Sequence, residues 1–269
     1  NAVAVQLELP VALPEVDWSN PLTRGLKAAL VFDGGYAFDA ATGKPAALTT
    51  LFGTPRVAAF PGSGELSLYT PNGSAASVFP GEDWYGPCTI IWKCYVESVD
   101  NPWGGLLAKL ATGTATQLSM QRNSSNNNFY LSRNYSTSLV TGRSLSSLLS
   151  LPKTFAISSE SAAAASRLAI HVDGSLVQAF NPAEAQTGGA GALLLGCENS
   201  SSATYDSSVY WSSFLRFDRE LSAGEIAAIG TNPRRLLVQE RRIWVPVSAG
   251  GGLTAVTSDA PLAWTVRNA

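Results

Sequence analysis

Glycoside hydrolysis would require two carboxylates, one on each side of the scissile bond. The two carboxyl groups stand about 5–5.5 Å apart in retaining enzymes and about 6.5–9.5 Å apart in inverting ones. Glu82 and Asp83 are neighbours in the chain, so they point to opposite faces of any strand. Asp218 and Glu220 share a face, but they occupy a strand-to-helix corner, where support of the turn explains them. We therefore expect no enzymatic activity, with glycan hydrolysis as the least favoured alternative.

His171 is the only histidine of the chain. A nucleophilic triad needs a serine or cysteine and an orienting acid beside the histidine. The sequence has no G-x-S-x-G elbow, and alternation along SRLAIHVDG (166–174) places His171 opposite Leu168, Ile170 and Val172. This pattern predicts a histidine on the polar face of a sheet, without a catalytic role.

Metal chemistry has little support in the sequence. Calcium needs six to eight oxygen ligands, and the candidate loop acids are simpler as turn residues. These acids are Asp33, Asp39, Asp173 and Asp206. Cys88, Cys94 and Cys197 form no C-x-x-C motif and are odd in number, so neither a zinc site nor a disulfide framework is indicated. We expect no metal and no cofactor, and cysteines that behave as small core residues.

Sugar binding would use aromatic rings together with loop amides. Trp84 and Trp103 lie beside glycine and proline in expected loops, which favours exposure, whereas Trp92 and Trp211 are expected in the core. The candidate glycan-binding residues are Trp84, Tyr85, Trp103, Asn126, Tyr130 and Tyr205.

Composition narrows the classes of partner. Of the 269 residues, 45% are hydrophobic, which is enough for a large core, and only 14% are charged. The net charge of −2 gives no electrostatic basis for binding nucleic acid. No segment reaches the roughly 20 apolar residues of a membrane span, so membrane insertion is not expected.

Strand signals dominate the chain. In CTIIWKCYVE (88–97), Ile90, Trp92 and Cys94 fall on one face and Lys93 and Tyr95 on the other. About eleven to thirteen such short segments, separated by regular turn signals, predict an all-β sandwich or barrel.

One short helix is predicted near the end of this strand-rich region. Ser222 and Glu225 form a capping box, and Leu221 with Ile226 forms a hydrophobic staple. Gly230 provides a helix stop. So short a helix has little stability alone, so Ile226 and Ile229 must pin it to a sheet edge or rim.

Four segments in this order resemble laminin-G-like, concanavalin A-like jelly-roll domains. They are GLKAALVFDGG (25–35), PCTIIWKCYVE (87–97), TFAISSE with SRLAIHVDGSLVQAF (154–180), and VYWSSFLRFDRELSAGEIAAIG (209–230). The resemblance implies an antiparallel two-sheet jelly-roll sandwich with one short C-terminal helix. It also implies an N-terminal arm (1–22), the sandwich (23–237) and a C-terminal strand-like tail (238–269).

A narrower resemblance concerns the flanks of the sandwich. DWSNPLTRGL (17–26) and NPRRLLVQERRIWVPVSAG (232–250) look like versions found in tailed-bacteriophage and prophage virions. This resemblance implies a non-enzymatic structural protein, a head decoration, fibre or tail module, assembled in the host cytoplasm. Its partners would be capsid or tail proteins and further copies of itself. The alternative is an adhesin that binds host surface glycans.

The two arms carry apolar residues that an isolated sandwich does not need. An extended segment can add a strand to the sheet edge of a neighbour, and apolar arms left exposed would lower solubility. The candidate assembly contacts are Leu7, Leu9, Val11, Leu13, Trp244, Val245 and Trp264. Folding back of both arms on their own domain remains equally open at this point.

Overall fold

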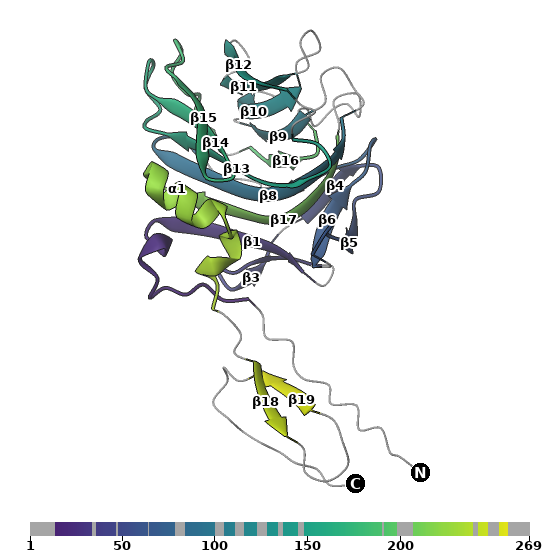
Figure 1. Ribbon diagram of the computed structural model, residues 1–269. Coiled ribbons are helices and arrows are strands. Elements are labelled where there is room, and N and C mark those ends of the chain that lie inside the picture. The colour runs from purple at the N-terminus through teal and green to yellow at the C-terminus, as the bar shows by residue number, and fades with distance from the viewer. Residues whose placement is uncertain are drawn as a thin grey trace.

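The computed structural model describes residues 14–33, 36–46, 48–63, 65–78, 84–99, 105–110, 116–122, 128–133, 137–144, 148–189, 191–197, 207–238, 242–246 and 253–257. Two antiparallel sheets face each other and form a sandwich, as Figure 1 shows. This architecture confirms the predicted jelly-roll sandwich. No helix in the described part of the chain is long and apolar enough to cross a membrane.

The larger sheet has ten strands. Its main order is β15-β14-β13-β8-β17-β1-β2-β3, and β6 pairs with both β17 and β5. The strands are β1 (Leu26–Asp33), β2 (Tyr36–Asp39), β3 (Lys44–Pro45), β5 (Arg56–Ala59), β6 (Leu66–Thr70), β8 (Cys88–Ser98), β13 (Pro152–Ser159), β14 (Leu168–Val172), β15 (Ser175–Phe180) and β17 (Ser208–Phe217).

The smaller sheet has seven strands in the order β12-β11-β10-β9-β16-β7-β4. They are β4 (Leu48–Phe52), β7 (Ala75–Val78), β9 (Gly105–Leu110), β10 (Thr116–Arg122), β11 (Asn128–Arg133), β12 (Thr137–Ser144) and β16 (Leu193–Leu195). The glycine, proline and threonine residues of 38–50 are typical of a loop, yet this range contributes to β2, β3 and β4. Two further strands, β18 (Arg242–Pro246) and β19 (Leu253–Thr257), pair only with each other among the described strands.

The core lies between the two sheets. Ile90, Trp92 and Cys94 of β8 are fully buried there, as the alternation in the sequence predicts. They belong to one cluster with Met120 and Leu131 of the smaller sheet. The predicted turn at Asp173 and Gly174 is also present, and both residues have positive φ, as a two-residue hairpin turn requires.

The helix α1 (Ala223–Gly230) covers part of the outer face of the larger sheet, where it contacts β13 and β15 (Figure 1). Ile226 and Ile229 are buried in a second cluster with Ile91, Ala156 and other outward-facing apolar residues of the strands. The two isoleucines therefore fix the helix, as expected, but on a sheet face as well as beside the edge strand β15.

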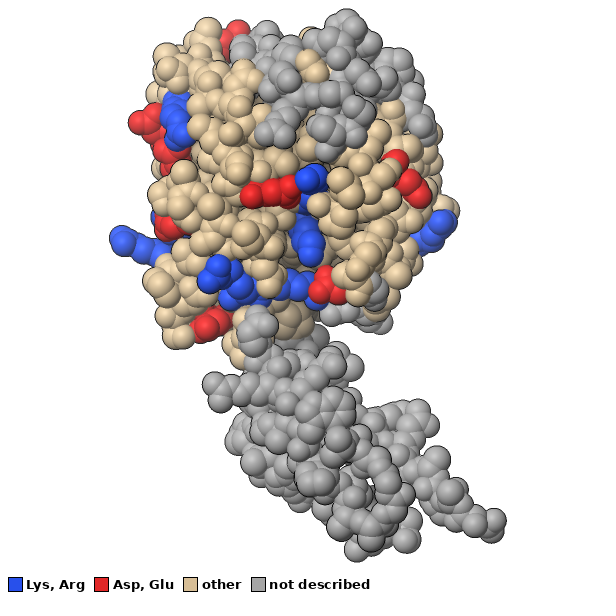
Figure 2. Space-filling model, viewed as in Figure 1, with Lys and Arg blue, Asp and Glu red and all other residues tan. Residues whose placement is uncertain are grey.

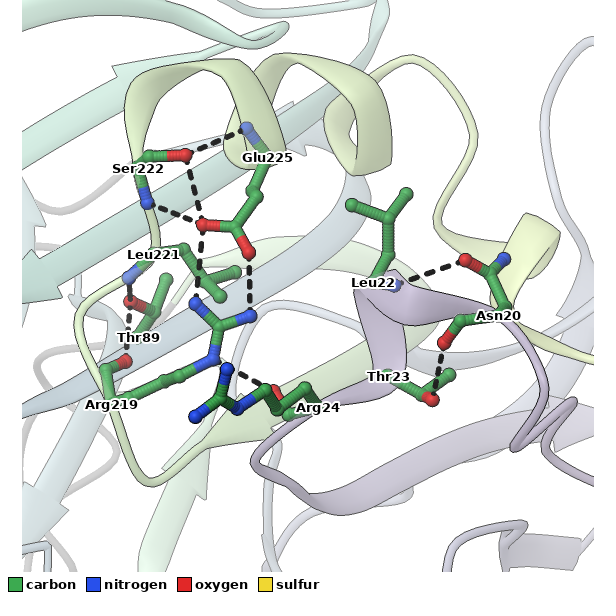
Figure 3. Close-up of polar contacts among 9 residues, drawn as sticks. All are labelled: Asn20, Leu22, Thr23, Arg24, Thr89, Arg219, Leu221, Ser222 and Glu225. Carbon is green, nitrogen blue, oxygen red and sulfur yellow. Dashed lines mark hydrogen bonds and ion pairs between the residues drawn. The ribbon is translucent and has the colours of Figure 1, made fainter.

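The corner before α1 is held by side chains, as Figure 3 shows. The capping box is present: Ser222 Oγ accepts from the Glu225 amide, and Glu225 accepts from the Ser222 amide. Arg219 donates to both carboxylate oxygens of Glu225 and to the Arg24 carbonyl. Thr89 of β8 accepts from the Leu221 amide and donates to the Arg219 carbonyl. The corner is therefore architectural, joined to the strand beneath it.

The described part of the N-terminal arm packs on its own sandwich. Val16 forms an antiparallel bridge with Leu237 and is buried in the cluster beneath α1. The Asp17 amide donates to the Leu236 carbonyl. A short 3-10 helix, η1 (Pro21–Thr23), leads into β1, and a second, η3 (Pro233–Leu236), follows α1. Residues 14–22 thus fold back.

The candidate assembly contacts are largely untested. Leu7, Leu9, Val11, Leu13 and Trp264 lie outside the described residues. For Trp244 and Val245 the structure gives strand pairing alone, with Ala255 and Thr254 respectively. Docking by the arms stays a prediction.

Candidate binding face

Three tyrosines form a row on the outer face of the larger sheet. Tyr69 of β6 and Tyr95 of β8 both pair with Tyr210 of β17, which lies between them. Their neighbours in the chain, such as Leu68 and Trp211, point into the core. Because side chains alternate along a strand, the three rings share the opposite face. We call this set, Tyr69, Tyr210 and Tyr95, the tyrosine row.

The rings of the row pack closely against one another. Tyr69 and Tyr210 are stacked with ring centroids 4.1 Å apart, and Tyr95 meets Tyr210 edge to face at 5.8 Å. Arg56 of β5 extends the row, since its guanidinium carbon lies 5.1 Å from the centroid of the Tyr69 ring. The strands β5 and β17 flank β6 on opposite sides, so Arg56 and Tyr210 cover opposite faces of Tyr69. The contacts fix the rings before any ligand arrives.

Glu97 of β8 accepts a hydrogen bond of 2.6 Å from the Tyr69 hydroxyl. Burial and this bond to Glu97 raise the pKa of Tyr69 to about 12. Burial, followed by the charge of Glu97, also raises the pKa of Tyr210. Both phenols are therefore neutral near pH 7. The row combines neutral hydroxyls with an exposed carboxylate and an exposed guanidinium.

The row offers hydrogen bonds more readily than open ring faces. Tyr69 is only 7% exposed, whereas Tyr95 and Tyr210 are half-buried and Arg56 and Glu97 are exposed. In Figure 2, charged side chains on the visible face are few and of both signs, with no large patch of one charge. Such a surface suits a neutral ligand rich in hydroxyl groups.

The sequence-based glycan candidates are not brought together. Trp84 is a correction: its indole is 2% exposed and stacks on Phe214 at 5.9 Å, so it cannot meet a sugar from solvent. Its ring lies near Lys109 and Arg216. Tyr85 is 57% exposed, in agreement with the expectation. The remaining candidates, Trp103, Asn126 and Tyr205, lie outside the described residues.

Tyr130 lies in the smaller sheet, on β11. It is half-buried, while its neighbours Phe129 and Leu131 are fully buried in the core. Tyr130 therefore faces outward on the side of the sandwich opposite the tyrosine row. A single small ligand therefore cannot contact both Tyr130 and the tyrosine row.

Tyr69, Tyr95 and Tyr210 are not among the glycan-binding residues predicted from the sequence. Alternation in residues 88–97 already placed Tyr95 on the outer face. Predicting the row would have required the strand order. Its paired residues Tyr69 and Tyr210 are 141 residues apart in the chain (210 minus 69). Such long-range pairing leaves no local signal.

The acidic residues considered for catalysis or metal binding have other partners. Asp218 pairs with Lys27 at 3.0 Å, and Glu220 pairs with Arg167 at 2.6 Å. Asp39 accepts from the Ala29 and Ala41 amides, and Asp173 accepts from Lys153. Within the described ranges, no group of three or more histidine, cysteine or acidic residues is placed to hold a metal ion. The structure does not describe the side chain of Asp33 or any part of Asp206.

Comparison with known proteins supports the fold of this chain. No protein-family model matches the sequence, and no curated protein matches it. Solved structures do match. The binding domain of Paraclostridial Mosquitocidal Protein 1 aligns with a TM-score of 0.59 and 11% identity, over 77% of this chain and 52% of that one. The fold is a jelly-roll sandwich.

Two further structures share this sandwich. The sialidase of Trypanosoma rangeli in complex with sialic acid aligns with a TM-score of 0.59 and 17% identity, over 80% of this chain and 34% of that one. The botulinum neurotoxin type G receptor binding domain aligns with a TM-score of 0.52 and 13% identity, over 76% and 50%. The chain thus spans only about a third to a half of these proteins. At such low identity the likeness concerns architecture alone.

Proposed function

We propose that this chain is a non-enzymatic binding module that recognises glycans through the tyrosine row. The observation that carries the proposal is the alignment of Tyr69, Tyr210 and Tyr95 on adjacent strands, with Arg56 and Glu97 exposed beside them. Sugar hydroxyls both donate and accept hydrogen bonds. Tyrosine hydroxyls, a carboxylate and a guanidinium together supply both kinds of partner.

Rigidity of the row favours binding. A ligand loses less free energy on association when the side chains it meets are already ordered. Arg56, Tyr69 and Tyr210 are packed in one stack, and Tyr69 is tied to Glu97. Recognition then needs little rearrangement of the protein.

The architectural neighbours are in keeping with this proposal. One matched structure is described as the binding domain of a mosquitocidal protein, another as the receptor binding domain of a neurotoxin, and a third is a sialidase in complex with sialic acid. The low proportion of charged residues, 14%, agrees with an uncharged hydroxylated ligand. Host surface glycans are the ligand class that we propose.

The proposal that the chain is not an enzyme rests on the ion pairs of two acidic residues. Asp218 and Glu220 are each held by a cation at the corner before α1. Because both carboxylates are ion-paired at this corner, we propose that neither acts with a second carboxylate across a scissile bond, as glycoside hydrolysis requires. The assay that decides this part is release of reducing sugar from host polysaccharide, and we expect none.

The virion assignment remains a separate prediction. It depends on the resemblance of residues 17–26 and 232–250 to phage proteins and on the arms beyond the described residues. A glycan-binding module is compatible with a fibre or tail location. Localisation in purified particles would test it.

A glycan array tests the proposed function. We expect the full chain to bind a defined subset of glycans, and Tyr210→Ala to lose that signal. Tyr85→Ala is the matched control, because Tyr85 is exposed and lies outside the row. Folded protein that binds nothing on a broad array would refute glycan binding. Loss with Tyr85→Ala and not with Tyr210→Ala would refute the row as the site.

A further inference from the structure

A pocket lies on the outer face of the larger sheet, where the beginning of α1 meets β14. Its volume is about 270 Å³. This is slightly below the range of roughly 300–1,000 Å³ that is usual for drug-sized ligands. It is lined by Arg167, His171, Glu220, Leu221, Ser222 and Ala223. We call it the α1–β14 pocket.

His171 is the unusual residue of the α1–β14 pocket. The residue is 1% exposed, and neither ring nitrogen has a hydrogen-bond partner among the described residues. Burial, followed by the charge of Arg167, lowers the pKa of His171, so the imidazole is neutral near pH 7. A neutral imidazole presents one N–H donor and one nitrogen acceptor. Buried polar groups are normally paired, and His171 is one of the residues that line the pocket, so a ligand bound there is the candidate partner for its imidazole.

Arg167 and Glu220 provide the second polar element. Their ion pair joins one guanidinium nitrogen to one carboxylate oxygen at 2.6 Å. The same carboxylate oxygen lies 3.5 Å from the Ser158 hydroxyl. Both charged side chains are partly exposed, at 40% and 25%. Among the described residues, the contacts of this pair involve only one guanidinium nitrogen and one carboxylate oxygen, so the other N–H groups and the second oxygen can meet a ligand.

The first turn of α1 adds a donor. The amides of the first helical residues have no partner within a helix. In α1 the Ser222 hydroxyl accepts from the Glu225 amide, and the Ala223 amide has no hydrogen-bond partner among the described residues. This amide lies at the wall of the pocket, since Ala223 is one of the lining residues.

The charge of the lining selects the ligand class. Arg167 and Glu220 neutralise each other and His171 is uncharged, so the pocket has no net charge. An anion such as a carboxylate would only accept hydrogen bonds and would meet the repulsion of Glu220. A hydroxyl group donates and accepts, and two adjacent hydroxyls match the alternating donors and acceptors of His171 and of the Arg167–Glu220 pair.

We propose that the α1–β14 pocket is a second subsite, which binds a pair of neighbouring hydroxyl groups of a pyranose or of a free polyol. This inference rests on the proposed glycan-binding function and assigns it a further place on the same sheet. Tyr95 pairs with Pro152 and Ala156 with His171, so the two sites are four residues apart along β13. At about 3.3 Å per residue the offset along β13 is roughly 13 Å, and the two strand spacings from β8 to β14 add about 10 Å sideways. The two sites are therefore roughly 16 Å apart, which suits two units of one glycan or two separate ligands.

The single histidine makes the test direct. In the full chain, the non-exchangeable ring C–H signals of His171 are followed by NMR during titration with D-mannose, D-galactose, D-glucose and myo-inositol. We expect a saturable shift with at least one probe, with a Kd on the order of 1–10 mM. Arg167→Gln removes the guanidinium from the lining of the pocket and keeps His171 as the reporter. We expect this variant to bind the probe at least tenfold more weakly. Lys27→Gln, which removes another ion pair of the same corner, serves as the control and is expected to bind normally.

The outcomes separate this inference from the proposed function. Absence of a saturable shift with all four probes, or equal affinity in Arg167→Gln, overturns the pocket even if the array detects glycans. A saturable shift that persists in Tyr210→Ala supports the pocket independently of the row. Response to the sugars indicates a glycan unit, and response to myo-inositol alone indicates a free polyol. Either response fits the hydroxyl pair that we assign.

Discussion

The hydroxyl of Tyr69 donates to Glu97 across the strand β17, which separates their strands β6 and β8. Tyr210 of that middle strand stacks on Tyr69 at 4.1 Å. Side chains thus link three strands on the outer face of the sheet, in addition to their backbone pairing. This arrangement holds the neutral Tyr69 hydroxyl beside the Glu97 carboxylate, where both can meet a ligand.

Replacement of Glu97 by Gln should lower the pKa of Tyr69 from about 12, because the carboxylate disfavours the phenolate. Burial is the larger cause and remains, so the value should stay above 10. Titration of the Tyr ring-carbon NMR signals checks this, with exposed Tyr85 as an internal reference. An unchanged Tyr69 titration would show that Glu97 does not act on the ring.

Glu225 should make stability depend on acid. Its hydrogen bonds from Arg219 lower the pKa to about 2, against 4.5 for a free glutamate. The contribution of Glu225 is therefore complete above pH 4.5 and is lost as the pH falls towards 2. Because the side chain is partly exposed, we expect on the order of 1 kcal/mol after screening by solvent. Denaturant unfolding at several pH values measures it.

Glu225→Gln is the companion variant for that measurement. Glutamine preserves the shape of the capping box but carries no charge. It should therefore reduce the pH dependence between 4.5 and 2 while retaining the helix. An identical pH dependence in the wild-type chain and in the variant would contradict the assignment to Glu225.

Ile226→Ala should destabilise the fold by about 2–5 kcal/mol, because it opens a cavity beneath α1. Ile226 is 1% exposed and packs with outward-facing residues of the sheet. Denaturant midpoints give the change. Val57→Ala is the control: Val57 is 40% exposed, and its loss should change stability by less than about 0.5 kcal/mol. Equal effects of the two substitutions would mean that α1 contributes little.

Gly174→Ala should disturb the contact between the β14–β15 turn and α1. Gly174 has φ +80°, and a Cβ there would lie 2.7 Å from the Cα of Ala227. We expect a loss of roughly 1–3 kcal/mol from backbone strain, together with a shift of the His171 NMR signals as α1 moves. Gly62→Ala has similar φ but open space around it, so it isolates the strain from the clash. Equal losses of stability in Gly174→Ala and Gly62→Ala would contradict a close approach of Gly174 to Ala227.

Local sequence patterns predicted much of the fold. Alternation at Ile90, Trp92 and Cys94, the Asp173–Gly174 turn and the Ser222–Glu225 cap all involve neighbours in the chain, and all are present. The short strands within 38–50 were missed because glycine, proline and threonine there read as loop. Their pairing partners lie elsewhere in the chain and stabilise them.

The candidate site was less predictable because it depends on pairing between distant segments. Trp84 was expected to be exposed from its neighbours in the chain, yet its contact with Phe214 buries it. Tyr210 and Tyr69 carry no local mark of a site, and only the strand order brings them together. His171 was placed correctly on the side of its strand that faces away from the core, but the helix beside it begins 52 residues later in the chain, at Ala223 (223 minus 171).

The most direct test of the account is a crystal structure of the full chain with the glycan that gives the strongest array signal. We predict a sugar ring over the tyrosine row, with hydroxyl groups within hydrogen-bond distance of Glu97 and Arg56. A sugar bound beside Tyr85, or on the outer face of the smaller sheet beside Tyr130, would contradict the central claim.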